Sequence, residues 1–199
     1  TMPDGPSVVV LPFENLSGDP EQKYFVDGLT TDITNAFTAF SLKVIGAGSA
    51  AVYADKQDDV SAIAAALGVR YLVKGSVRRL GDQLRISVQL ISGEDGSNLW
   101  GDSFDADLSG DDLFATMDDV VAAIVAQIAG EYGAINRSAV VGLAERAPES
   151  MTTYECYLRF YQLERTFALE DFTVAVACME RALEADPDYA EGWAQLALL

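Results

Sequence analysis

"YLVKGSVRRLGDQLRISVQLI", residues 71–91, decides how this chain folds. Two runs of alternating apolar and polar residues flank Gly81-Asp82, a dipeptide that is typical of a two-residue hairpin turn. The register that this turn predicts places three pairs on an apolar face: Val77 with Ile86, Gly75 with Val88, and Val73 with Leu90. The opposite face carries Lys74, Ser76 and Arg78 against Gln89, Ser87 and Arg85. One apolar and one polar face predict a sheet that is covered on one side.

Strands and helices alternate before this hairpin. Residues 7–13, SVVVLPF, predict a buried strand, and residues 42–48, LKVIGAG, predict a second strand. Between them a helix is expected to follow Asp19, a suitable N-cap, with Pro20 at its first position. The residues expected on its buried face are Phe25, Leu29, Ile33, Phe37 and Phe40.

A further helix precedes the hairpin, and a strand and a long helix follow it. The first helix is capped by Asp58 or Asp59 and ends at Gly68. Its expected inward residues are Val60, Ile63, Ala64 and Leu67. Residues 98–108 predict a fifth strand, and a long amphipathic helix begins at Leu113. The apolar face of that helix is expected to consist of Phe114, Met117, Val121, Ile124 and Ile128.

This order of elements predicts two domains. Residues 7–130 are expected to form an α/β (α+β) two-layer domain, with a mixed five-stranded sheet and helices on one face. Residues 131–149 are a helical linker, and residues 150–199 are all helical. Within the last region, ALEADPDYAEGWAQLA (residues 182–197) resembles a tetratricopeptide repeat. Because Arg159 stands where that motif has Trp, we expect one atypical repeat and the first helix of the next.

Composition excludes several functions. The 199 residues include 13 Lys and Arg against 31 Asp and Glu, which gives a formal net charge of −18. Nucleic acids are bound mainly through Lys and Arg, so this charge argues against nucleic-acid partners. The absence of His excludes His-based triads and His-ligated zinc. Cys156 and Cys178 are in no C-x-x-C arrangement and are expected to be two buried thiols.

Apolar runs in the sequence are short. None reaches the ~18 residues that a membrane-spanning helix needs, so we expect no membrane insertion by this segment. A cytoplasmic location is expected, and the alternative is the periplasmic side of a membrane-anchored regulator. No cofactor is expected.

Three long motifs carry a family resemblance. VVVLPFENLSGDPEQKYFVDGLTTDITNAF (8–37), LGVRYLVKGSVRRLGDQLRISVQLISGEDGSNLW (67–100) and LFATMDDVVAAI (113–124) resemble the TolB amino-terminal-like domain. The resemblance implies a mixed-sheet α/β domain without catalytic residues, commonly followed by tetratricopeptide repeats. Such domains occur in bacterial regulators, behind a class III adenylate/guanylate cyclase domain or a winged-helix DNA-binding domain.

The resemblance therefore implies a non-catalytic regulatory and protein-interaction module of a larger bacterial signalling protein, in particular a class III nucleotide cyclase. The alternative is a small-ligand sensing domain of a transcriptional or cyclase regulator, with its ligand beside a loop at residues 46–52. In either case this segment is not an enzyme, and any cyclase domain lies outside it.

Two short motifs imitate ligand sites. Gly46-Ala47-Gly48 with Ala51 approaches the dinucleotide fingerprint, but no helix is expected at once after it and no acid ends the next strand. Residues 105–116, DADLSGDDLFAT, imitate a calcium loop but end in Thr116 instead of Glu. We interpret the first motif as a strand end that runs into a small-residue loop. We interpret the second as a turn with a helix cap, and weak calcium binding by it stays an alternative. The acids near the first helix are interpreted as caps and solvated loop residues: Glu14, Asp19, Glu21 and Asp27.

Lys74, Arg78 and Arg85 form a basic strip that departs from the acidic background. Arg78 and Arg85 are predicted cross-strand neighbours, and like charges in such a pair repel. An acid should therefore lie near them. It comes either from the fifth strand, which offers Asp102, Asp105 and Asp107, or from an acidic patch on a partner domain or subunit.

Trp193 and Leu196 are core positions of the repeat motif. Repeats of this kind bury their apolar strip against the next repeat and bind proteins or peptides on a concave surface. Part of that strip is expected to be uncovered in this chain. We expect the last helix to dock on the preceding pair or to be covered by another copy, which makes a homo-oligomer possible. Protein partners or other domains of the same polypeptide are thus expected at both surfaces.

Overall fold

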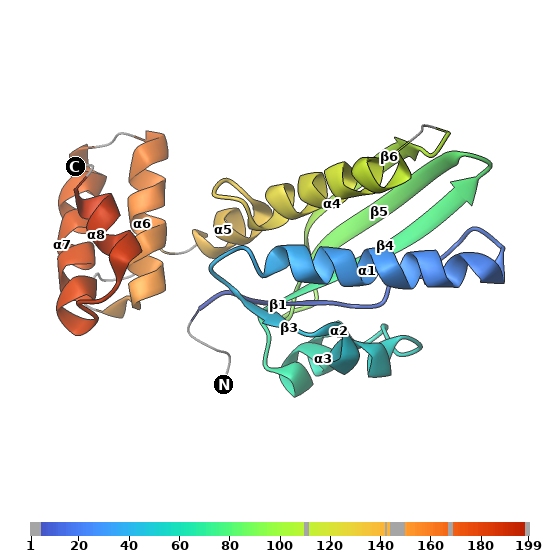
Figure 1. Ribbon diagram of the computed structural model, residues 1–199. Coiled ribbons are helices and arrows are strands. Elements are labelled where there is room, and N and C mark those ends of the chain that lie inside the picture. Colours follow the sequence, from blue (N-terminus) through green and yellow to red (C-terminus); the bar gives the residue numbers. More distant parts are fainter. Residues whose placement is uncertain (1–4, 110–111, 142, 144–149, 167–168, 198–199) are drawn as a thin grey trace. The chain divides into compact units, whose positions relative to one another are not determined.

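The chain folds into two compact units, residues 1–135 and 136–199. The computed structural model describes residues 5–109, 112–141, 143, 150–166 and 169–197. Unit 1 contains the sheet and unit 2 is helical (Figure 1). Among the described residues, no helix combines the length and the apolar character that crossing a bilayer requires.

A mixed sheet of six strands forms the centre of unit 1. The strands are β1 (Ser7–Val10), β2 (Glu14–Asn15), β3 (Lys43–Ile45), β4 (Tyr71–Leu80), β5 (Gln83–Ser92) and β6 (Asn98–Asp107). Their order is β3-β1-β4-β5-β6, and β2 continues beyond β1 along β4. β1 pairs in parallel with β3 and β4, whereas β4, β5 and β6 form an antiparallel meander. The prediction of five strands was wrong because β2, at two residues, is too short to show a period of its own.

The β4–β5 hairpin has the predicted register. Val77 pairs with Ile86, and Arg78 pairs with Arg85. The other four predicted pairs are also present: Val73–Leu90, Lys74–Gln89, Gly75–Val88 and Ser76–Ser87. Gly81 has a φ of 61° in the turn, a conformation that glycine adopts without steric cost.

Helices cover both faces of the sheet (Figure 1). On one face lie α1 (Lys23–Phe37), which follows the 3₁₀ turn η1 (Pro20–Gln22), and α4 (Leu113–Ala129). On the other face lie α2 (Ala47–Ala50), η2 (Ala51–Tyr53) and α3 (Val60–Leu67).

The prediction of helices on one face only was therefore wrong. β1 shows why: Val8 and Val10 belong to the core under α1 and α4, whereas Val9 and Leu11 belong to the core under α2 and α3. A strand that is buried on both faces has no polar alternation, and "VVVL" has none.

Most predicted helix caps are present. Asp19 Oδ1 accepts a hydrogen bond from the Glu21 N–H at 2.9 Å. Asp59 Oδ1 accepts one from the Ala62 N–H at 3.0 Å, and Gly68 ends α3 with a φ of 64°. The predicted start and end of α3 are therefore confirmed. Asp19 caps η1, the 3₁₀ turn that leads into α1, and α1 itself begins three residues later than predicted, at Lys23.

The predicted inward face of α4 is correct except at its start. Val121, Ile124 and Ile128 are buried, but the Phe114 side chain is 83% exposed. Its prediction was wrong because the core contacts of α4 begin only at Met117, one turn after the first residues of the helix.

Unit 2 contains α6 (Thr153–Thr166), α7 (Leu169–Ala185) and α8 (Ala190–Leu196), and α5 (Ala134–Ala139) precedes them at the boundary of the units. The region predicted as a linker holds α5, and much of its remainder lies outside the described residues. The buried cluster of unit 2 lies mainly between α6 and α7 and includes Cys156 and Cys178. The two cysteines form a disulfide, so their burial was predicted correctly but their state as thiols was not.

Candidate protein-interaction surface

One side of the β4–β5–β6 meander forms a polar face. Helices cover this side of β4 only near its start, where Leu72 is buried. Because side chains alternate along a strand, the side that carries Leu72 can be followed along all three strands. Most positions beyond Leu72 on this side are polar, and the exceptions are exposed Leu80 at the end of β4 and Gly101 on β6. We call this surface the polar face; its residues are Lys74, Ser76, Arg78, Arg85, Ser87, Gln89, Ser103 and Asp105. The three cations of the predicted basic strip therefore share one face.

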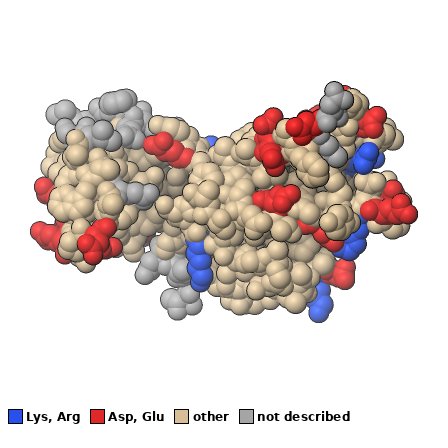
Figure 2. Space-filling view, in the orientation of Figure 1, with Lys and Arg blue, Asp and Glu red and all other residues tan. Residues whose placement is uncertain are grey.

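Acidic side chains are spread over the part of unit 1 that carries α1 and α4 (Figure 2). The cations of the polar face lie on the opposite side of the sheet from these helices. They do not act as a single group, however, because each has different partners.

Lys74 forms a hydrogen bond within unit 1. Its Nζ donates a hydrogen bond to the Gln57 carbonyl oxygen at 3.0 Å, and the Gln57 side chain in turn donates to the Pro12 carbonyl at 2.8 Å. Gln57 is buried. Gln57 was not predicted from the sequence, because a single polar residue between turn residues has no periodic signal. The two hydrogen bonds tie the segment before α3 to β4 and to the end of β1.

Arg85 forms the ion pair that the like-charge argument requires. Its Nε and Nη2 donate to the two carboxylate oxygens of Asp105 at 2.6 and 2.7 Å, across the β5–β6 pair. This hydrogen bonding raises the pKa of Arg85 and lowers the pKa of Asp105. β6 is the strand that the sequence predicted as the fifth. It supplies the acid beside Arg85, so the first of the two predicted alternatives is confirmed.

Arg78 is the cation of the polar face that stays available. Its side chain is exposed and forms no hydrogen bond or ion pair with any described residue, although its backbone pairs with Arg85 in the sheet. The guanidinium of its neighbour Arg85 is already held by Asp105. An isolated exposed guanidinium on an otherwise acidic chain is a suitable contact for a carboxylate of another domain or protein.

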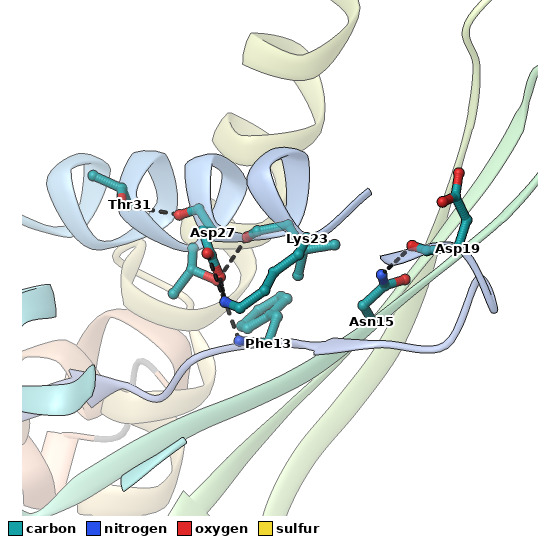
Figure 3. Close-up of polar contacts among 8 residues, drawn as sticks. Phe13, Asn15, Asp19, Lys23, Asp27 and Thr31 are labelled. Carbon is teal, nitrogen blue, oxygen red and sulfur yellow. Dashed lines mark hydrogen bonds and ion pairs between the residues drawn. The ribbon is translucent and has the colours of Figure 1, made fainter. Parts of the chain in front are cut away.

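The acidic loop before α1 has a structural role (Figure 3). Asn15 Nδ2 donates to the Asp19 carbonyl at 2.8 Å, and Lys23 Nζ forms an ion pair with Asp27 at 2.7 Å. The Phe13 N–H donates to Thr30 Oγ1 at 3.2 Å, which fixes the chain between β1 and β2 against α1. These contacts explain the motif by helix initiation and packing, as predicted, and they give no pair of carboxylates with an acid–base role.

The small-residue stretch after β3 was predicted to be a loop. In the structure it forms the one-turn helix α2, followed by η2. Gly46 stands at the N-cap of α2 and Ala50 is buried under it. The prediction of a loop was wrong because small residues without periodicity gave no helical signal. β3 is the edge strand of the sheet, whereas the fingerprint of a dinucleotide fold lies on its first, central strand.

Residues 105–116, which resemble a calcium-binding loop in sequence, do not form such a loop among their described residues. They end β6 and cap α4. Asp105 and Asp107 lie in β6, and Asp107 Oδ1 accepts from the Ser109 N–H at 2.9 Å. Asp112 caps α4 by accepting from the Ala115 N–H at 2.9 Å. Residues 110–111 lie outside the described part of the chain. Within the described part, no cluster of three or more acidic or sulfur side chains is placed to hold a metal ion.

Trp193 and Leu196 differ in burial. Leu196 packs on the cluster between α6 and α7, as a core position should. Trp193 is 52% exposed, and its Nε1 donates to the Pro187 carbonyl at 2.9 Å. Its prediction as a core position does not hold within the described residues, because α8 turns only part of its apolar strip towards α7.

Asp95, in the turn between β5 and β6, has an altered pKa. Ser97 donates to Asp95 Oδ1 from its N–H at 3.1 Å and from its hydroxyl at 2.8 Å. Hydrogen bonds from Ser92 and Ser97 lower the pKa of Asp95 to about 2. Because the folded-state pKa is lowered, the stabilisation is present above the ordinary Asp pKa of about 4. It is lost as the pH falls through about 2.

We therefore expect carbon-detected NMR to give a titration midpoint near 2 for the Asp95 carboxyl. In urea unfolding, Asp95→Ala should differ from the wild type above about pH 4 and converge with it near pH 2. A midpoint near the ordinary Asp value would show that the serine hydrogen bonds do not persist in solution.

Comparison with known proteins gives one family and one long relative. Residues 5–123 match the family described as HilA/YgeH-like transcriptional regulator, second domain. Over 199 residues the chain is 36% identical to "Putative adenylate cyclase 3" of Rhizobium meliloti (strain 1021). The match covers 100% of this chain and 33% of that protein, so the chain spans about a third of its relative's length.

Solved structures with a similar fold include lipoprotein GNA1162 of Neisseria meningitidis, at 16% identity and a TM-score of 0.49 over 62% of this chain and 98% of that one. TolB of Acinetobacter baumannii is similar at 15% identity and a TM-score of 0.41, over 62% of this chain and 27% of that one. The tetratricopeptide assignment of residues 150–199 stays a prediction.

Proposed function

We propose that this chain, which belongs to the family of the HilA/YgeH-like transcriptional regulator second domain, is a non-catalytic regulatory and protein-interaction module of a larger signalling protein. The observation that carries the proposal is the continuous 36% identity to a protein named as a putative adenylate cyclase, of which the match covers 33%. The catalytic domain of such a protein would lie in the other two thirds. We propose a class III nucleotide cyclase as the output.

The chemistry of the described residues supports a non-catalytic role. The chain has no His. Four of the acids that the sequence singled out serve as helix caps or ion pairs: Asp19, Asp27, Asp105 and Asp112. Glu14 and Glu21 are exposed. General acid–base catalysis needs a titratable group that is placed beside a substrate, and the four Asp carboxylates are committed to backbone and side-chain partners.

Two surfaces are proposed for contacts with other domains or proteins. The first is the polar face, where Arg78 offers the available charge beside Lys74 and Arg85. The second is α8, where exposed Trp193 and half-buried Leu196 would receive the next helix of a tetratricopeptide array or another copy of the chain. We keep the division into residues 7–130, 131–149 and 150–199 as the proposed domain organisation.

We propose a cytoplasmic location for this module, because a nucleotide cyclase uses cytoplasmic nucleotides. The disulfide of unit 2 favours the alternative, the periplasmic side of a membrane, if it is permanent. In a reducing compartment the same disulfide would be transient, and the pair would alternate between the disulfide and two thiols.

The polar face is tested in the full-length protein that contains this chain. Arg78→Glu is expected to change the rate of cyclic-nucleotide formation by about fivefold or more, because it reverses the available charge of the proposed contact. Lys43→Glu is the matched control: it makes the same charge change at an exposed position on the edge strand β3, two strands away from β4. Equal rates for both variants and the wild type would contradict a contact at Arg78.

A small-ligand sensor would behave differently. Titration of the chain with a panel of metabolites and nucleotides would then raise its melting temperature, because a ligand that binds only the folded state stabilises it. The interaction proposal expects no such shift for the isolated chain.

A further inference from the structure

The disulfide of unit 2 lies at the centre of a small core. Cys156 of α6 and Cys178 of α7 are both 0% exposed. Around them pack the other buried members of the cluster: Met151, Phe160, Met179, Ala182 and Leu183. A helical unit of this size buries little apolar surface, so a cross-link between its two long helices contributes a large share of its stability.

A fixed cation lies beside both sulfurs. Arg181 Nη2 is 3.5 Å from Cys156 Sγ and 3.9 Å from Cys178 Sγ. The same nitrogen donates to the Met151 carbonyl oxygen at 2.6 Å, a contact that does not depend on the disulfide. Arg181 follows Cys178 by three residues on α7, so the helix itself holds the guanidinium over the bond. A guanidinium in this place stabilises a thiolate relative to a thiol.

We infer that Cys156 and Cys178 form a thiol–disulfide exchange site in which Arg181 stabilises Cys156 as the leaving thiolate. The inference goes beyond the proposed function and does not depend on it. Nothing in it requires a cyclase, and its test reads the sulfur chemistry directly.

The reductant is a dithiol. One of its thiolates attacks Cys178 Sγ, the S–S bond breaks, and the electron pair goes to Cys156 Sγ, which is the sulfur nearer to Arg181. The second thiol of the reductant then attacks the mixed disulfide and releases Cys178. The protein pair gains two electrons and two protons, and the dithiol becomes a cyclic disulfide.

Access to the sulfurs requires the helices to open. Both cysteines are buried, so exchange proceeds from a locally opened form of the α6–α7 pair. Tyr189 and Leu196 pack on the cluster that contains the sulfurs, so reduction also loosens the support of α8. The redox state of the pair would thereby control how firmly unit 2 presents α8.

The titratable groups with described side chains on the two helices are Tyr154, Glu155, Tyr157, Arg159 and Tyr161 on α6, and Glu180, Arg181 and Glu184 on α7. Arg159 and Tyr161 are buried, Tyr157 packs on the cluster, and the Glu155 carboxylate accepts from the Thr152 N–H at 2.8 Å. Glu180 and Glu184 are exposed, and Tyr189 precedes α8. Arg181 is the group whose charge lies at both sulfurs.

The test measures the equilibrium between the chain and a buffer of reduced and oxidised dithiothreitol, with thiols trapped by alkylation and counted by intact mass. Arg181→Met is expected to shift this equilibrium towards the disulfide by about threefold or more near pH 8.5, where thiols are about half ionised. Near pH 6, where thiols are protonated, the shift should be close to absent. Arg181→Lys keeps the cation and should stay close to the wild type.

This readout separates exchange chemistry from simple packing. A substitution that destabilises the oxidised and reduced folds equally leaves the equilibrium unchanged, and one that acts only through packing gives a shift that does not vary with pH. Either result for Arg181→Met would overturn the inference. So would a wild-type chain that stays fully oxidised under excess dithiol while folded but is reduced in urea. Cys156→Ser, which cannot form the bond, provides the baseline for the alkylation count.

Discussion

Replacing Gly75 with valine is expected to lower the free energy of unfolding of unit 1 by roughly 3 kcal/mol or more, the upper range for overpacking a core. Gly75 lies on the core side of β4, directly against the ring of Phe13. A Cβ at this position would overlap with Cε2 and Cζ of the Phe13 ring. The ring cannot withdraw easily, because Phe13 is buried and its N–H is held by Thr30 Oγ1.

Urea unfolding followed by circular dichroism measures this effect. Gly101→Val is the matched control, because the nearest atom to a Cβ at Gly101 is 3.5 Å away, an ordinary contact. Phe13→Ala makes room, so Gly75→Val should cost much less in that background than alone. Equal losses for Gly75→Val and Gly101→Val, or additive losses in the double variant, would contradict the described packing of Phe13.

Ile63→Ala should cost about 2–4 kcal/mol, the range for truncating a buried aliphatic side chain. Ile63 belongs to the core under α2 and α3, together with Val9, Leu11 and Leu72. The expected loss follows from the second covered face of the sheet. If helices covered one face only, Ile63 would be exposed and its truncation nearly neutral.

Val52→Ala is the control for this prediction, because Val52 is an exposed aliphatic residue of the neighbouring turn η2. It should leave the urea midpoint almost unchanged. A neutral Ile63→Ala would show that α3 does not pack on the sheet in solution.

The parts of the fold that the sequence predicts well are those with local signals. The hairpin register followed from Gly81 and from strict alternation on both strands, and all six predicted pairs are present. The caps at Asp19 and Asp59 followed from residue type and spacing, and both side chains accept the expected hydrogen bonds.

The parts that it predicts poorly depend on contacts between distant segments. β2 pairs with β4 over only two residues, which leaves no pattern to detect. α2 consists of small residues, and its place is set by the burial of Ala50 against β1 and β4 rather than by a polar stripe. The disulfide depends on the packing of α6 on α7, which spacing alone could not give.

The sequence predicted which cations lie on the polar face. It did not predict which groups inside the unit these cations contact. Alternation placed Lys74, Arg78 and Arg85 on one face, and like-charge repulsion required an acid near Arg85, which is Asp105. Lys74 donates a hydrogen bond to the carbonyl of Gln57, which lies in a turn whose contacts no sequence pattern predicts. Arg78 therefore emerges as the available cation only once the structure shows what its neighbours hold.

We propose that this chain regulates a catalytic domain that lies elsewhere in a longer protein. The most direct test compares cyclic-nucleotide formation by the full-length protein and by a form that lacks residues 1–199, at equal concentrations. The account predicts that the shortened protein still forms product, at a rate that differs from the full-length rate by about fivefold or more, as expected for a coupling between domains. An unchanged rate would contradict the regulatory role, and the complete loss of product would contradict the placement of catalysis outside this chain.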